Sequence, residues 1–101
     1  MIIRGTTPTH TFTLPIDSDQ CVKVRIIYAQ DNVVLIKIDG DRVAYSGDTV
    51  SCKLTQEETQ ALDCMKLCDV QVRVLTVAGD AMASEIIRVK VGRCLDDEVL
   101  K

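Results

Sequence analysis

The chain contains no tryptophan, and its only aromatic residues are Phe12, Tyr28 and Tyr45. Proteins that bind single-stranded nucleic acid stack the bases on aromatic side chains beside basic grooves, and phosphate binding depends on Lys and Arg. Here 12 basic residues face 15 acidic ones, which gives a formal net charge of −3. The sequence therefore predicts no nucleic-acid partner.

Long hydrophobic runs are also missing. No window approaches the roughly 20 consecutive apolar residues that a membrane helix needs. The opening residues 1–5 lack the basic region and apolar run of a secretory leader. We therefore expect synthesis in the cytoplasm and no membrane contact, with later assembly into a particle still open.

The cysteines give no metal site or disulfide framework. Their number is odd, and without a secretory leader reduced thiols are the better interpretation for Cys21, Cys52, Cys64, Cys68 and Cys94. One close pair does not make a zinc site, which usually combines two or more such pairs. We predict neither a metal nor another cofactor.

Catalytic groups are equally scarce. His10 is the only histidine, and its polar neighbours predict a solvent-facing or edge position rather than that of a general base. Asp39 and Asp41 flank Gly40 in a predicted turn, and the acidic run 96–98 lies in the tail. Neither group offers the two unlike environments that carboxylates need for acid–base work. The sequence predicts no enzyme.

Alternating apolar and polar residues fill most of the chain and predict seven strands. Their ranges are Thr9–Leu14, Cys21–Ala29, Val33–Ile38, Arg42–Tyr45, Thr49–Leu54, Asp69–Val77 and Ala81–Val91. Turn residues at 30–32, 39–41, 46–48 and 78–80 separate several of them. Thr55 and Glu58 have the spacing of a capping box and predict a helix that ends near Leu62 or Asp63.

These elements predict one domain over residues 1–101. We expect an all-β fold, an immunoglobulin- or fibronectin-like antiparallel β-sandwich of about seven strands, with the helix as the connection between sheets. A five-stranded barrel is the main alternative. Residues 92–101 lose the strand pattern and predict either a short helix or a frayed tail.

Alternation also assigns the faces of the strands. Val22 and Val34 are expected to point inward with their apolar neighbours, and so is Ile87. Glu85 would share the inward parity of its strand, which predicts a bulge near Ser84 or Glu85.

The outward residues suggest one interaction surface. If the strands at 33–38, 69–77 and 81–91 lie in one sheet, apolar side chains gather at one end of a charged face, and such patches tend to be interfaces. The candidate residues are Val33, Leu35, Leu75, Val77 and Ile86. A bulge that shifts the facing, or a tail that covers the patch, is the open alternative.

Three segments carry a family resemblance: residues 4–12, 53–59 and 83–87. With them the chain resembles small uncharacterised proteins encoded in prophage-like regions of gut Firmicutes. The resemblance implies a phage- or prophage-encoded structural or assembly protein, such as a tail or baseplate component. Its partners would be other particle proteins or further copies of itself. A small-ligand or carbohydrate-binding module is the alternative function.

Overall fold

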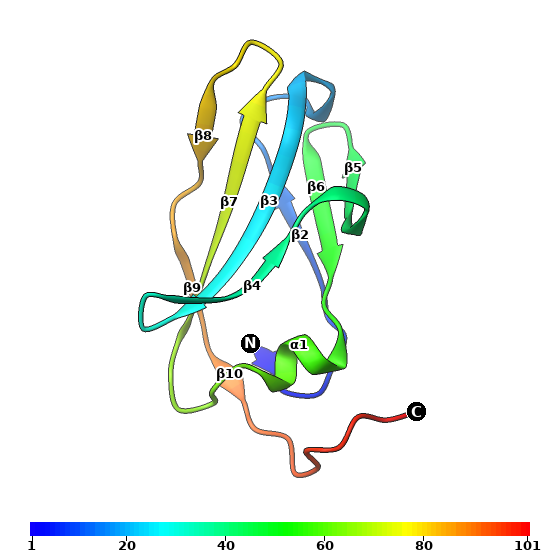
Figure 1. The fold of residues 1–101 in the computed structure, drawn as a ribbon, viewed down its shortest axis with the longest axis vertical. Coiled ribbons are helices and arrows are strands. Elements are labelled where there is room, and N and C mark those ends of the chain that lie inside the picture. Colours follow the sequence, from blue (N-terminus) through cyan, green and yellow to red (C-terminus); the bar gives the residue numbers. More distant parts are fainter.

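The computed structural model describes all residues 1–101. Two antiparallel sheets face each other across one core, and a third sheet consists of two short strands (Figure 1). The larger sheet contains, in spatial order, β4 (Val33–Ile38), β3 (Cys21–Gln30), β7 (Cys68–Thr76) and β8 (Ala81–Ala83), with β9 (Ile87–Val89) further along the same edge. The smaller sheet contains β2 (Thr9–Thr13), β6 (Thr49–Lys53) and β5 (Val43–Ser46). The predicted all-β fold is confirmed, and because no ladder joins the two sheets, the barrel alternative is wrong.

Two predicted turns form tight hairpins. Asp31 and Asn32, with φ values of 50° and 64°, link β3 to β4 as the only non-glycine residues in the left-handed region. Two consecutive residues with positive φ match the twist of antiparallel strands, and Asp and Asn tolerate this conformation better than most residues. Gly47, with φ of 59°, begins the two-residue link between β5 and β6.

The helix α1 (Gln56–Gln60) begins with the predicted capping box. The Thr55 hydroxyl accepts a hydrogen bond from the Glu58 amide at 3.1 Å, and the Glu58 carboxylate accepts one from the Thr55 amide at 2.9 Å. α1 carries the chain from β6 of the smaller sheet to β7 of the larger, as predicted, but it ends two or three residues earlier than expected. Two 3₁₀ turns, η1 (Ser18–Gln20) and η2 (Gly40–Arg42), complete the helical elements. No helix in the chain is both long and apolar enough to cross a membrane.

Inward side chains of both sheets build one core of 17 buried residues. It is aliphatic, as the composition requires, and Tyr28 is its single buried aromatic residue. Val24 and Ile26 of β3 and Val72 of β7 meet Val50 of β6 in this cluster. Burial of such side chains contributes about 1.5–3 kcal/mol each, so the core holds the two layers together.

Two bulges overturn the predicted facing of single residues. The β3–β7 ladder shifts between Cys21 and Lys23, which leaves Val22 outside the alternation and 64% exposed. The β3–β4 ladder shifts at Tyr28 and Ala29, and Val34 is consequently 47% exposed. One extra residue in a strand reverses the facing on one side of it.

The predicted strand at 81–91 is divided into three pieces. Its irregularity falls at residues 84–86, as expected, where the Ser84 hydroxyl accepts a hydrogen bond from the Val72 amide at 3.0 Å. Ile87 pairs with the buried Val70, so it faces inward, but it is half exposed because the smaller sheet does not cover it.

The third piece, β10 (Val91–Gly92), leaves the sheet and pairs in parallel with β1 (Ile2–Ile3), a ladder that the sequence did not predict. Ile2 and Val91 are both buried there. A side chain at Gly92 would meet the end of the Ile3 side chain, which would have to move aside.

Candidate interaction site

The apolar residues of the predicted patch are all exposed: Val33, Leu35, Leu75, Val77 and Ile86. Their expected grouping is wrong, because β3 lies between β4 and β7. Val33 pairs with Gln30 at one end of β3, whereas Leu75 pairs with Lys23 near the other end. The patch therefore divides into separate groups, and the binding role of its residues stays a prediction.

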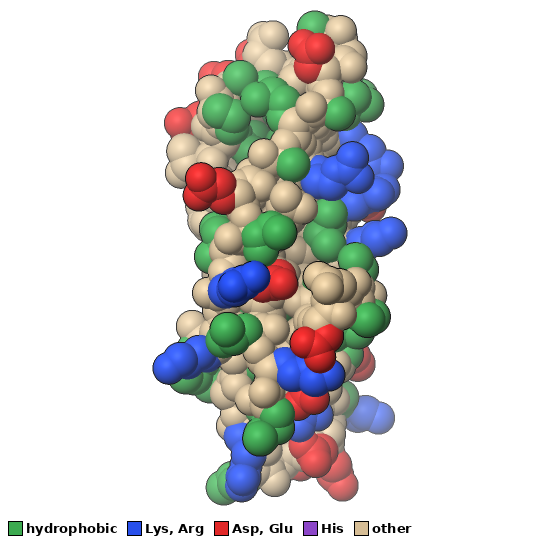
Figure 2. All heavy atoms as spheres, turned by 90° about the vertical axis from the view of Figure 1, so that its left-hand side faces the viewer, with side chains coloured by type: hydrophobic (Ala, Val, Ile, Leu, Met, Phe, Trp, Pro, Cys, Tyr) green, Lys and Arg blue, Asp and Glu red, His purple; other side chains and the backbone are tan.

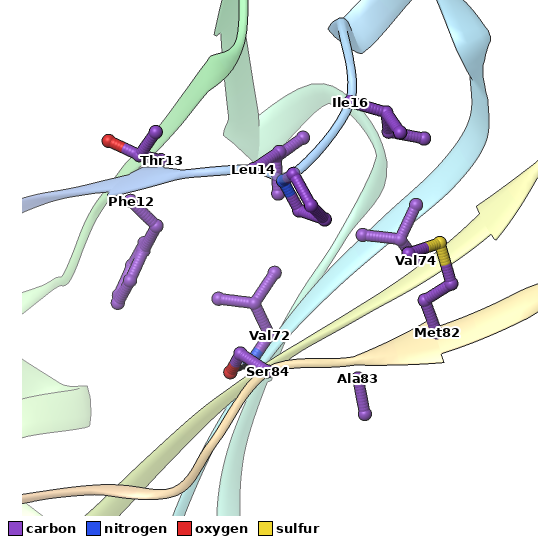
Figure 3. Close-up of a pocket in the computed structure, with 10 residues that line it drawn as sticks. Phe12, Thr13, Leu14, Ile16, Val72, Val74, Met82, Ala83 and Ser84 are labelled. Carbon is purple, nitrogen blue, oxygen red and sulfur yellow. Dashed lines mark hydrogen bonds between the residues drawn. The ribbon is translucent and has the colours of Figure 1, made fainter.

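A different apolar feature lies between the sheets. The sandwich is open along the side where β2 faces β8, and a hollow of about 90 Å³ enters the core there. Figure 3 shows Phe12, Leu14 and Ile16 on one wall, opposite Val74 and Met82 on the other. Because its walls are core side chains, an inserted apolar group would extend the core itself.

A second hollow continues along the same side, between β2 and β9. It has a volume of about 250 Å³ and is lined by His10 and Phe12 of β2 and by Val70, Ile87 and Val89. Phe12 lines both hollows, so they follow each other along the opening. On the opposite side of the sandwich η2 links β4 to β5 and bridges the two sheets.

The strands that flank the opening have edges without charged residues. β2 has the sequence Thr-His-Thr-Phe-Thr and β8 the sequence Ala-Met-Ala, so neither contains a charged residue. Each is the last strand of its sheet on that side and has no partner on its outer edge. Natural proteins usually protect exposed edges with charges, proline or bulges, because unpaired backbone groups invite another strand. β2 and β8 are therefore suited to strand addition.

Basic side chains gather on the outer face of the larger sheet next to β8. Lys23, Arg25 and Arg73 line a shallow depression of about 290 Å³ together with Leu75 and Ala81. Figure 2 shows basic side chains at the right of the β8 side of the molecule, with hydrophobic side chains to their left. β8 thus has an apolar hollow behind it and a basic surface in front.

One acidic residue accompanies these cations. The Asp39 carboxylate lies 2.9 Å from Arg25 Nε and 3.8 Å from Lys23 Nζ. Arg73 takes part in none of the six ion pairs of the structure and is exposed. Arg73 is therefore the cation that remains available to an anionic partner.

His10 lies on an edge strand as predicted, but it is half buried and turned inward. Its Nδ1 is 2.6 Å from the Tyr28 hydroxyl, which is 3.5 Å from Cys52 Sγ. Burial lowers the pKa of His10 and raises the pKa of Cys52. A thiol with a raised pKa, 2% exposed, is a poor nucleophile, so this chain of contacts is structural.

The other cysteines form no disulfide and belong to no metal-binding cluster. All five thiols are free, and no cluster of three or more His, Cys, Asp or Glu side chains is arranged to hold a metal ion. Burial raises the pKa of Cys68 to about 11, so this thiol is protonated at neutral pH.

Residues 93–101 form no helix, so the helical interpretation is wrong, and the frayed tail stays a prediction. The segment contacts α1, where the Gln56 amide donates to the Leu100 carbonyl at 3.0 Å and accepts from the Leu100 amide at 2.8 Å. Gln60 donates to the Asp97 carbonyl at 2.9 Å, and Arg4 contacts the Asp97 carboxylate at 3.3 Å. Polar groups hold the segment, and Leu100 is left 74% exposed.

One property of the open side could have been found in the sequence, but its position in the fold could not. The absence of charge in residues 9–13 and 81–83 was visible, but the approach of these strands across the opening depends on the spatial order of the sheets.

The sequence matches no protein-family model and no curated protein.

Proposed function

We propose that this chain is a non-enzymatic structural or assembly protein, encoded by a phage or prophage, that acts through protein–protein contacts. The observation that carries the proposal is the open side of the sandwich, where two uncharged edge strands flank an apolar hollow. An extended segment can pair with such an edge and place side chains in the hollow, which is a common way of recognising peptides. The immunoglobulin-like identity of the sandwich is part of the proposal.

A small-ligand module has weaker support. Pockets for small molecules usually have volumes of about 300–1,000 Å³. The most apolar hollow measures about 90 Å³, and the larger basic depression is a shallow part of an open sheet face. One or two apolar side chains of a protein partner fit the apolar hollow better than a whole ligand does.

The test uses particles purified from the strain that carries the gene. We expect the wild-type chain to sediment with these particles and Met82→Asp, which places a charge at the hollow, to be lost from them. Met65→Asp is the matched control, because Met65 is 86% exposed and does not line the open side. Circular dichroism checks that both variants are folded.

The proposal is overturned if the wild-type chain is absent from particles and forms no complex with co-expressed particle proteins. It is also overturned if Met82→Asp and Met65→Asp are incorporated equally well.

A further inference from the structure

β8 presents two different surfaces to a strand that pairs with its free edge. Met82 pairs with Val74 and points into the hollow between the sheets. Ala81 pairs with Leu75 and Ala83 pairs with Arg73, so these positions belong to the outer face. A residue opposite Met82 would enter the hollow, and its two neighbours would lie on the outer face, because side chains alternate along a strand.

The outer positions are open to long side chains. An added strand lies about 4.8 Å beyond β8 and about 9.6 Å from β7. Ala83 is the only residue between that strand and Arg73 in its row, and its methyl group leaves the guanidinium free to pass over it. In the next row, Leu75 presents an apolar surface beside Ala81. A strand that fits this edge has an acidic residue next to Ala83 and Arg73, an apolar residue in the hollow, and a second apolar residue next to Ala81 and Leu75.

The segment held on α1 contains this pattern. Glu98, Val99 and Leu100 follow one another, with Glu98 and Leu100 exposed. In antiparallel register, Glu98 lies opposite Ala83 and next to Arg73, Val99 enters the hollow opposite Met82, and Leu100 reaches the row of Leu75. A parallel register would exchange the two outer residues and place the carboxylate next to Leu75.

We propose that the free edge of β8 binds residues 98–100 of a second copy of this chain as an added antiparallel strand. This inference rests on the proposed function, because it names the partner that one open edge takes. A contact between the tail of one molecule and β8 of another closes as a dimer where the two molecules exchange tails, and continues as a chain of molecules where they do not.

The same molecule does not supply this strand while its fold is intact. Met82 pairs with Val74 and Val89 pairs with Cys68, and these two partners are six residues apart along β7. Gly92 lies a further three residues beyond Val89. At about 3.3 Å per residue this path spans about 30 Å. The seven residues from Gly92 to Val99 reach at most about 25 Å. A second molecule is needed.

The contacts of the tail with α1 of its own molecule compete with its binding to β8 of a second molecule. Gln56 occupies both backbone groups of Leu100. A segment bound to β8 has to leave this amide, so Gln56 restrains self-association. Gln56→Ala is therefore expected to strengthen self-association several-fold.

The experiment mixes two variants that cannot associate alone. A chain lacking residues 93–101 keeps β8 but has no segment to donate, and Arg73→Glu keeps the segment but repels Glu98. Sedimentation velocity should show weak association of the wild type, with a Kd on the order of 0.1–1 mM for so small a contact. Each variant alone should be monomeric, and an equimolar mixture should form a one-to-one complex that high salt weakens.

Two further variants make the test specific. Lys37→Glu makes the same charge change at another exposed cation of this sheet that forms no ion pair, and it should behave as the wild type. The tail of Glu98→Arg should not bind the β8 edge of a wild-type chain. It should bind the β8 edge of a tail-deleted chain that carries Arg73→Glu. Circular dichroism confirms that each variant is folded.

The inference is overturned if the tail-deleted chain associates as the wild type does, or if the equimolar mixture stays monomeric. In either case, incorporation of the wild-type chain into particles still tests the proposed function separately. If the wild-type chain neither enters particles nor associates with itself, the proposed function and this inference are both overturned.

Discussion

Arg25 and Arg73 lie directly opposite each other in the β3–β7 ladder, on the outer face of the larger sheet. Like charges in this position destabilise a sheet. Asp39, which is shared with Lys23, lies 2.9 Å from Arg25 and offsets only part of this repulsion, while Arg73 has no ion pair. The fold thus carries an electrostatic cost at the place where we propose that an acidic strand binds.

Removal of that repulsion should stabilise the isolated chain. We expect Arg73→Gln to raise the free energy of unfolding by about 0.5 kcal/mol at low salt, a difference that shrinks as salt screens the charges. Urea unfolding measures the change. Arg88→Gln is the control, because Arg88 forms an ion pair with Asp69 and its loss should bring no gain. A lower stability of Arg73→Gln would contradict the repulsion.

The Tyr28 hydroxyl should contribute to stability through both of its contacts. Tyr28→Phe removes the group that bridges His10 and Cys52 and leaves both without this partner. We expect a loss of about 1–2 kcal/mol, because a buried polar atom without a partner is costly. Tyr45→Phe, at a half-exposed position on β5, should change stability much less. Equal losses in the two variants would refute a special role for Tyr28.

His10 should make the fold sensitive to mild acid. Burial, and to a lesser degree the positive N-terminus, lowers the pKa of His10 in the folded chain. The unfolded chain, with an ordinary pKa of about 6.5, therefore takes up the proton first as pH falls. The free energy of unfolding should therefore be highest above pH about 6.5 and should fall as the pH decreases from there to the lower pKa that His10 has in the folded state.

The measurement is the urea midpoint between neutral pH and about pH 5.5, above the usual range of carboxylates. His10→Gln should remove most of the decline, since glutamine has no proton to gain. A decline that is unchanged in this variant would assign the acid sensitivity to another group.

A side chain at Gly92 would displace the ends of two flexible side chains. Its Cβ would collide with Ile3 Cδ1 and lie 3.0 Å from Met1 Sδ, and both of these side chains reach the surface and can move aside. We expect Gly92→Ala to lower the free energy of unfolding by less than about 1 kcal/mol, below the usual cost of overpacking a closed core. Ile3→Val removes only the colliding methyl group, so the double variant should recover part of the loss in thermal unfolding. No recovery would mean that another contact causes the loss.

Local features of the fold were readable from the sequence. Alternation predicted the strands around Ile26, Val50 and Val72, and the Thr55–Glu58 spacing predicted the cap, because these patterns arise within a few residues. The predicted inward orientation of Val22 and Val34 was wrong, because a bulge adds one residue to a strand without changing the apolar composition around it.

The interaction site was less predictable, because it depends on strand order. The placement of β3 between β4 and β7 separated Leu35 from Leu75, and the hollow arises where β2 and β8 end their sheets. The contact between Gln56 and Leu100 joins residues with no common pattern. Such relationships come from long-range packing, which local periodicity does not encode.

The β1–β10 ladder also has a consequence for biosynthesis. It joins residues 2–3 to residues 91–92, so Ile2, which is 1% exposed in the folded chain, lacks its neighbour until the ribosome has released Gly92. Contacts of such high sequence separation slow folding. Nascent chains therefore leave this isoleucine without its partner strand until residues 91–92 have emerged, and the ladder closes only after that.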